Sequence, residues 1–178
     1  MIKVLSRKPV FKADLFDVFE TEVELPNGET HTYHDAVRKT AISAFPLTDN
    51  HEIYLIDQYR YLHKGRIIEA VAGFIEESEK PIDAAKRELK EETGIEAETW
   101  QELSTVDAAG SIITWEQPLF LAKNLKLGQA TPEDSEDIKL VKFTLSQAVE
   151  LVMSGVIRTA SSIVGILMID KLVQEGKL

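Results

Sequence analysis

Residues 87–94, RELKEETG, predict part of a helix with three glutamates on one side. At 100° per residue, Glu88, Glu91 and Glu92 share an arc that borders the apolar stripe of the same helix. That stripe consists of Ile82, Ala85 and Leu89. Like charges three or four residues apart weaken a helix by a few tenths of a kcal/mol per pair. The arc therefore indicates a carboxylate-rich site at the edge of the core, with a solvated helix face as the alternative.

The length and charge of the chain limit the kinds of protein it can be. Its 178 residues, 44% hydrophobic and 28% charged, suit one globular domain with a small appendage. The net charge is −10, and Lys and Arg do not cluster as a duplex nucleic-acid binder requires. We therefore expect no nucleic-acid partner. An acidic protein can still bind an anionic small molecule when metal ions lie between them.

The absence of cysteine excludes disulfides, Cys-ligated metals and thiol nucleophiles. The N-terminal residues MIKVLSRKPV lack the apolar stretch and cleavage site of a signal peptide. The longest apolar run, Ile163 to Ile169, is far shorter than the roughly 20 residues that span a bilayer. We expect a soluble, cytoplasmic protein with no membrane partner.

The first forty residues predict a β-layer of their own. Residues 18–25 alternate between apolar and polar side chains and lead into Pro26-Asn27-Gly28, a strong signal for a hairpin. The returning strand is expected at 29–37. We therefore predict an N-terminal hairpin and dimerisation layer at residues 1–40 and the main domain at residues 41–178.

The main domain mixes strands and helices, which indicates an α/β sandwich with a mixed sheet. The helix that contains residues 87–94 is expected to have Ser78 as its N-cap, Pro81 in its first turn and Gly94 as its end. Further helices are predicted at 145–153 and 160–173. The predicted strands are AISAFPL (41–47), EIYLIDQYR (52–60), IIEAVAGFI (67–75), PLFLA (118–122) and IKLVKF (138–143).

Residues 73–95, GFIEESEKPIDAAKRELKEETGI, resemble the signature of the Nudix hydrolases, Gly-x5-Glu-x7-Arg-Glu-aliphatic-x-Glu-Glu-x-Gly-aliphatic. At ordinary residue frequencies such a match arises by chance in on the order of one in a million chains of this size. The matching residues are Gly73, Glu79, Arg87, Glu88, Leu89, Glu91, Glu92, Gly94 and Ile95.

The resemblance implies the Nudix α/β/α sandwich, with a mixed sheet and an added antiparallel β-hairpin layer. It also implies a Mg²⁺ site, with Mn²⁺ as an alternative ion. Mg²⁺ prefers hard oxygen ligands, so carboxylates on one rigid helix can hold ions against a diphosphate. By the family pattern the metal ligands are Glu88, Glu92, Glu91 and the backbone carbonyl of Ala72. Arg87 is placed to hold Glu91 in orientation, and Glu79 is expected to position the preceding loop.

Flanking residues resemble the ADP-ribose pyrophosphatase branch of that family. DQYRY and IIEAVAGF are similar to its Gln-x-Arg strand and Glu-x-x-Ala-Gly stretch, and the C-terminal residues from Ser135 onward are also similar. The implied reaction is hydrolysis of a nucleoside diphosphate sugar into a nucleoside monophosphate and a sugar phosphate. Arg60 would contact a substrate phosphate, with a surface arginine as the alternative. Glu69 would lie near the metal or substrate, with a sheet-edge glutamate as the alternative.

One departure from that branch leaves the substrate open. The branch tends to carry Ser-Pro-Gly followed four residues after the Gly by Glu, whereas Asp107-Ala108-Ala109-Gly110 lacks the proline and Glu116 comes six residues after Gly110. A broader or GDP-mannose-type nucleoside diphosphate sugar hydrolase is therefore an alternative. Nucleoside triphosphate sanitation and a non-catalytic nucleotide-sugar sensor are more distant ones.

The resemblance also implies a general base and a partner subunit. The branch carries a glutamate base on the loop before its last strand, where this chain offers Glu133 and Glu136. Glu136 fits the branch pattern better, Glu91 is the next candidate, and a solvated acidic loop is the alternative. In this branch the N-terminal layer crosses to a second copy, so we expect a homodimer in which this layer completes the partner's nucleoside pocket.

Overall fold

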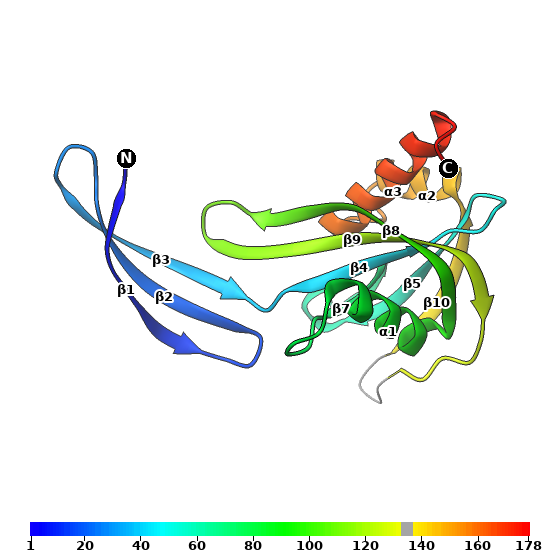
Figure 1. Cartoon of the computed structure of the whole chain (residues 1–178), viewed down its shortest axis with the longest axis horizontal. Coiled ribbons are helices and arrows are strands. Elements are labelled where there is room, and N and C mark those ends of the chain that lie inside the picture. Colours follow the sequence, from blue (N-terminus) through cyan, green and yellow to red (C-terminus); the bar gives the residue numbers. More distant parts are fainter. Residues whose placement is uncertain (133–136) are drawn as a thin grey trace. The chain divides into compact units, whose positions relative to one another are not determined.

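The structure, a computed structural model, describes residues 1–132 and 137–178 (Figure 1). The described chain forms two compact units. The first contains Met1–Thr40 and Asp107–Glu116, and the second contains Ala41–Val106 and Gln117–Leu178. The dimerisation role predicted for residues 1–40 stays a prediction.

The first unit is built on three antiparallel strands. They are β1 (Lys3–Lys12), β2 (Phe16–Glu24) and β3 (Thr30–Arg38). The predicted hairpin between β2 and β3 is confirmed, and its turn needs Gly28, whose φ of +86° favours glycine. Strand β1 was not predicted, because it is exposed along its whole length and contains Pro9. The end of a second hairpin joins this unit through parallel pairing of Ala36 with Ile113.

The second unit is a mixed α/β structure, which confirms the predicted fold class. Strand β4 pairs in parallel with β9 and antiparallel with β7, and β8 also pairs with β9. A second, antiparallel sheet has the order β10-β5-β6. The remaining elements of the described chain are β4 (Ala41–Pro46), β5 (Glu52–Arg60), a 3-10 turn (Tyr61–His63), β6 (Gly65–Glu69), β7 (Val71–Phe74), α1 (Pro81–Thr93), β8 (Ile95–Ala109), β9 (Ile113–Leu127), β10 (Ile138–Thr144), α2 (Leu145–Met153) and α3 (Ala160–Gln174). The end of β8 and the start of β9 belong to the first unit.

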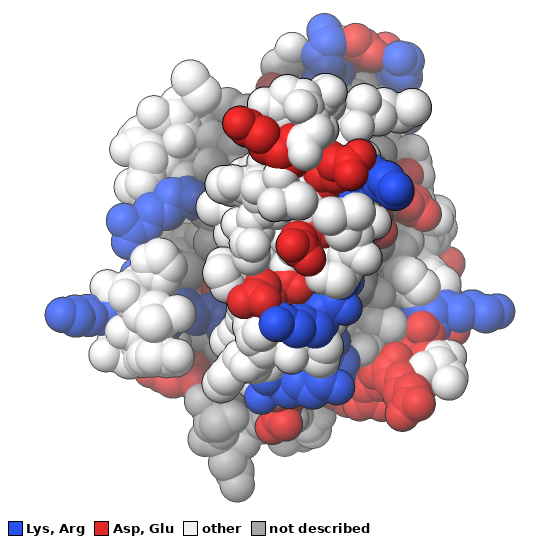
Figure 2. All heavy atoms as spheres, turned by 90° about the vertical axis from the view of Figure 1, so that its left-hand side faces the viewer, with Lys and Arg blue, Asp and Glu red and all other residues white. Residues whose placement is uncertain are grey.

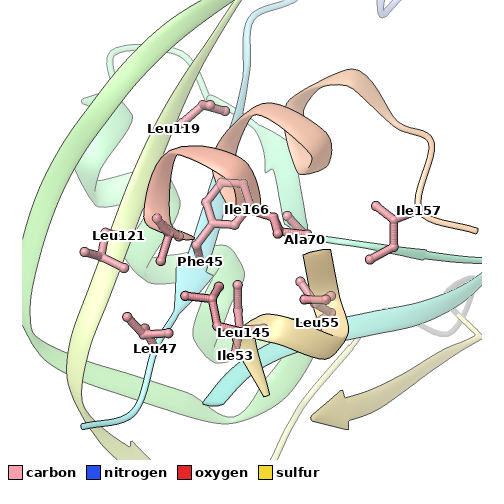
Figure 3. Close-up of a cluster of buried hydrophobic side chains, with 12 residues drawn as sticks. Phe45, Leu47, Ile53, Leu55, Ala70, Leu119, Leu121, Leu145, Ile157 and Ile166 are labelled. Carbon is pink, nitrogen blue, oxygen red and sulfur yellow. The ribbon is translucent and has the colours of Figure 1, made fainter. Parts of the chain in front are cut away.

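Alternating side chains of β5 face different helices. Leu55 packs in the cluster of Figure 3 with Phe45 and with residues of α2 and α3. Ile56 packs in a different cluster with Leu89 of α1. Helix α3 lies very close to β4, because a Cβ atom on Gly165 would come within 2.0 Å of the Phe45 ring. The sheets are therefore covered by α1 on one side and by α2 and α3 on the other, as Figure 1 shows.

The single strand predicted at residues 67–75 is wrong, because the chain divides there at Ala70. The Ala70 N–H donates to Ser162 Oγ on α3 at 2.9 Å, so this backbone group is not available to a sheet ladder. Strand β6 then pairs with β5, and β7 pairs with β4 in the other sheet. The division places Glu69 and Ala72, both predicted site residues, in different sheets.

The predicted end of α1 is confirmed and its predicted start is wrong. Gly94 adopts the left-handed conformation at φ +71° and its N–H donates to the carbonyl of Lys90. At the other end the N-cap is Lys80, not Ser78, which itself lies outside the helix at φ +66°. Glu79 instead organises this turn, since its Oε2 accepts from the Glu76 N–H at 2.9 Å.

The surface carries both signs of charge. On the face drawn in Figure 2, Lys and Arg side chains of the described residues are interspersed with Asp and Glu and do not gather into one patch. The exclusion of a nucleic-acid partner stays a prediction. Among the described residues, no helix is long and apolar enough to cross a membrane.

Candidate active site

The three glutamates of α1 differ strongly in exposure. Glu92 is 5% exposed, whereas the side chain of Glu91 is 46% exposed and that of Glu88 lies between them. The difference follows from the helix geometry, since Glu92 is one turn from Leu89, which is fully buried between α1 and the sheets. The predicted position of this arc at the edge of the core is therefore confirmed.

Gly73 provides the space that the Glu88 carboxylate occupies. A Cβ atom at residue 73 would lie 1.9 Å from Cδ of Glu88 and 2.0 Å from its Oε1, which is far inside van der Waals contact. Ala72 directly precedes Gly73 on β7, in register with Ser43 of β4. The signature glycine thus lets a carboxylate of α1 lie against the strand whose backbone carbonyl, at Ala72, is the fourth predicted metal ligand.

Arg87 connects the carboxylates of α1 to the preceding turn. Its Nη1 donates to Glu88 at 2.8 Å and to Glu91 at 3.1 Å, and its Nε donates to Glu79 at 3.0 Å. Nη2 also donates to the Phe74 carbonyl of β7 at 3.0 Å. These bonds raise the pKa of Arg87, with Glu79 as the largest cause. The predicted pair with Glu91 is present, and Glu79 holds the turn as expected.

In this arrangement the carboxylates of Glu79, Glu88 and Glu91 accept hydrogen bonds from Arg87. Among the described residues, no group of three Asp, Glu or His side chains is arranged to hold a metal ion. The physical reason lies in the two bonds from Nη1, which draw Glu88 and Glu91 toward the guanidinium. The donor set nevertheless suits a hard divalent cation, because it consists of carboxylate oxygens and a strand carbonyl. The residues present therefore fit a metal ion, provided that Glu88 turns from Arg87 toward it.

Arg60 and Glu69 form a second part of the site, on neighbouring strands. Glu69 is 7% exposed, and its Oε1 accepts from Arg60 Nε at 2.7 Å and lies 2.7 Å from Nη2. Glu69 pairs in register with Ile56, whose side chain contacts the α1 layer, so Glu69 belongs to the same face of the sheet. The structure therefore brings Arg60 and Glu69 to the side of the sheet that α1 covers.

Glu133 and Glu136, the two candidates for the general base, lie outside the described residues. The described residues on each side make specific contacts, one with α1 and the other with β6. The Thr131 N–H donates to the Glu91 carbonyl of α1 at 2.8 Å. Asp137 accepts from Arg66 Nη1 at 2.6 Å. The glutamate base stays a prediction.

The residues around the departure from the branch pattern lie in the first unit. Asp107 and Gly110 line a hollow of about 340 Å³ together with Asp35 and residues 111–115. Trp115, in the wall of this hollow, has the Arg38 guanidinium 4.1 Å from its ring centre. Sequence reasoning assigned no role to either residue, since neither belongs to a recognised motif.

The chain is similar in sequence and in fold to known proteins. The NUDIX domain pattern matches residues 37–159. The chain is 29% identical to the ADP-ribose pyrophosphatase of Bacillus subtilis (strain 168), over 85% of this chain and 83% of that protein. It is 27% identical to the methanol dehydrogenase activator of Bacillus methanolicus, over 92% of this chain and 90% of that protein. A crystal structure of an ADP compounds hydrolase superposes with a TM-score of 0.87 at 23% identity, over 99% of this chain and 97% of that one.

Proposed function

The chain belongs to the Nudix family of hydrolases, and from this premise we propose that it hydrolyses the diphosphate linkage of ADP-ribose or a related nucleoside diphosphate sugar. Water attacks one phosphorus, the bond from that phosphorus to the bridging oxygen breaks, and the products are a nucleoside monophosphate and a sugar phosphate. The observation that carries this proposal is the position of Glu88, between Gly73 of β7 and Arg87 of α1. Relatives named ADP-ribose pyrophosphatase and ADP-sugar pyrophosphatase support the substrate class.

The carboxylates of α1 provide oxygen ligands for a metal ion that would lie between them and the diphosphate. Family members generally use a divalent metal, and we propose Mg²⁺, with Mn²⁺ as an alternative, held by Glu88, Glu91, Glu92 and the Ala72 carbonyl. When bound, such an ion offsets phosphate charge and lowers the pKa of a coordinated water. Arg87 holds the Glu91 side chain in orientation and offsets part of the negative charge of Glu88 and Glu91. Arg60 presents a guanidinium that matches phosphate oxygens, while Glu69 fixes its orientation. Glu136 as the base stays a prediction.

Purified protein tested with Mg²⁺ against a substrate panel checks this proposal. The panel contains ADP-ribose, GDP-mannose, UDP-glucose, diadenosine compounds and dNTPs, and the products are resolved by chromatography. We expect cleavage of ADP-ribose into AMP and ribose phosphate, with activity lost on chelation and restored by Mg²⁺. GDP-mannose turned over faster than ADP-ribose would support the broader alternative. Turnover of dNTPs alone would contradict the proposal.

We also propose a homodimer formed through the first unit. Large apolar side chains of this unit are exposed, including those of Val4, Val10 and Phe11, and a thin sheet does not retain such a surface without a partner. The expected measurement is a dimeric native mass at micromolar concentration, with loss of activity on dilution below the dissociation constant. A fully active monomer would exclude this arrangement. The cytoplasmic location stays a prediction from the sequence.

A further inference from the structure

Gln58 on β5 is a buried polar residue without an evident structural purpose. It is 5% exposed, and its Oε1 has no hydrogen-bond partner among the described residues. Leaving a buried acceptor without a donor costs free energy that an apolar side chain of the same size would avoid. Gln117, equally buried, shows the usual solution, since its Nε2 donates to Ser43 Oγ at 2.9 Å and to the Ile42 carbonyl. Gln117 therefore has hydrogen-bond partners within the protein, whereas the Oε1 atom of Gln58 has none among the described residues.

The position of Gln58 on its strand places it on the face that carries the site. Side chains two residues apart on a strand share a face, so Gln58 lies on the same side of β5 as Ile56 and Arg60. Ile56 packs with Leu89 of α1, and Glu69 pairs in register with Ile56 on this face. Gln58 thus lies along β5 between Ile56, which packs beneath α1, and Arg60, which bonds to Glu69.

We propose that Gln58 is a further residue of the active site, and that its carboxamide oxygen accepts a hydrogen bond from an O–H group that arrives with the substrate. This inference rests on the proposed function. The diphosphate itself has no hydrogen to donate at neutral pH, so the donor is either a sugar hydroxyl of the substrate or the attacking water. Both provide the same chemistry, an O–H directed at a buried acceptor.

The test compares Gln58→Met with Gln117→Met, two substitutions that replace a buried carboxamide by an apolar side chain of similar length. For Gln58→Met we expect an unchanged or higher melting temperature, because the substitution removes a buried acceptor that has no donor among the described residues, together with kcat/KM for ADP-ribose lowered by about tenfold or more. For Gln117→Met we expect the opposite pattern. Its melting temperature should fall because two hydrogen bonds are removed, and its kcat/KM should stay near the wild-type value.

The effects of Gln58→Met on kcat and on substrate affinity, measured separately, identify the group that donates to Gln58. If a sugar hydroxyl donates to Gln58, then Gln58→Met weakens binding of ADP-ribose measured without a divalent ion. If the attacking water donates, the same variant lowers kcat and leaves that binding unchanged.

Three outcomes would overturn the inference. Unchanged kcat and affinity in an active protein would overturn it alone and leave the proposed function intact. A clear fall in the melting temperature of Gln58→Met would also overturn it, since the amide would then bond within the protein. Wild-type protein inactive on the whole panel would overturn the proposed function and this inference together.

Discussion

Glu92→Gln is expected to abolish most of the activity and to leave the fold intact. The substitution keeps the shape of the side chain but removes a charge that a divalent ion requires. Metal-assisted stabilisation of the transition state is worth several kcal/mol, so we expect a loss of on the order of 10²- to 10³-fold in kcat. Stability should be unchanged or slightly higher, because the substitution relieves repulsion between Glu92 and Glu88 one turn away.

The melting temperature provides a second measurement that does not depend on turnover. An ion that binds only the folded protein raises the melting temperature. We expect Mg²⁺ to do so for the wild-type protein and much less for Glu92→Gln. Glu102→Gln is the matched control, since Glu102 is an exposed residue of β8, and it should keep both the activity and the Mg²⁺ effect. Near-normal turnover of Glu92→Gln would exclude Glu92 as a metal ligand.

The parts of the fold that were predictable from sequence are those in which the local pattern and the tertiary environment agree. Helix α1 combines an apolar stripe with a glycine that must adopt positive φ, and the hairpin of β2 and β3 has both alternation and a turn glycine. The division at Ala70 was not predictable, because it depends on Ser162, which lies 92 residues away. The N-cap was misassigned for a similar reason, since Glu79 bonds to Arg87 eight residues later.

In the candidate site, too, contacts within one helix were predictable from the sequence and contacts between separate elements were not. Spacing on α1 was enough to predict the pair between Arg87 and Glu91, because residues four apart on a helix are neighbours. The bond from Arg87 to the Phe74 carbonyl and the contact between Glu88 and Gly73 require β7 to pass beside the helix. Helical periodicity cannot report such a contact. Gln58 was quoted only as part of the Gln-x-Arg resemblance and received no role, because its significance lies in a buried Oε1 without a partner among the described residues, which a sequence does not display.

The two signature glycines are required for different physical reasons. At Gly94 the backbone has φ +71°, and a Cβ atom would lie 2.6 Å from backbone atoms of Gly128 and Gln129. Backbone at this position cannot move without displacing that segment, so Gly94→Ala should destabilise the protein by more than about 1–2 kcal/mol. At Gly73 no positive φ is involved, and the obstructing atoms are the carboxylate end of Glu88, a flexible side chain. Substitution at Gly73 should therefore affect chemistry more than folding.

Gly73→Ala is accordingly expected to lower activity on the order of 10²-fold while the melting temperature changes by only a few degrees. The added methyl group would occupy the place of the Glu88 carboxylate, which can rotate away at little cost but then leaves the strand that carries the Ala72 carbonyl. Loss of one positioned metal ligand reduces transition-state stabilisation by several kcal/mol, and each 1.36 kcal/mol corresponds to tenfold in rate. Steady-state kinetics and thermal unfolding on the same preparation measure both quantities.

Combining Gly73→Ala with Glu88→Gln tests whether Gly73→Ala lowers activity by displacing Glu88. If Gly73→Ala acts by displacing Glu88, its effect and that of Glu88→Gln should not add, because both remove the same ligand. We therefore expect the double variant to be about as active as Glu88→Gln alone. Additive losses would mean that Gly73 acts independently of Glu88, and a destabilisation as large as that of Gly94→Ala would assign Gly73 a structural role. Normal activity of Gly73→Ala would contradict the placement of Glu88 in the site, because the added methyl group occupies space that the Glu88 carboxylate needs beside Ala72.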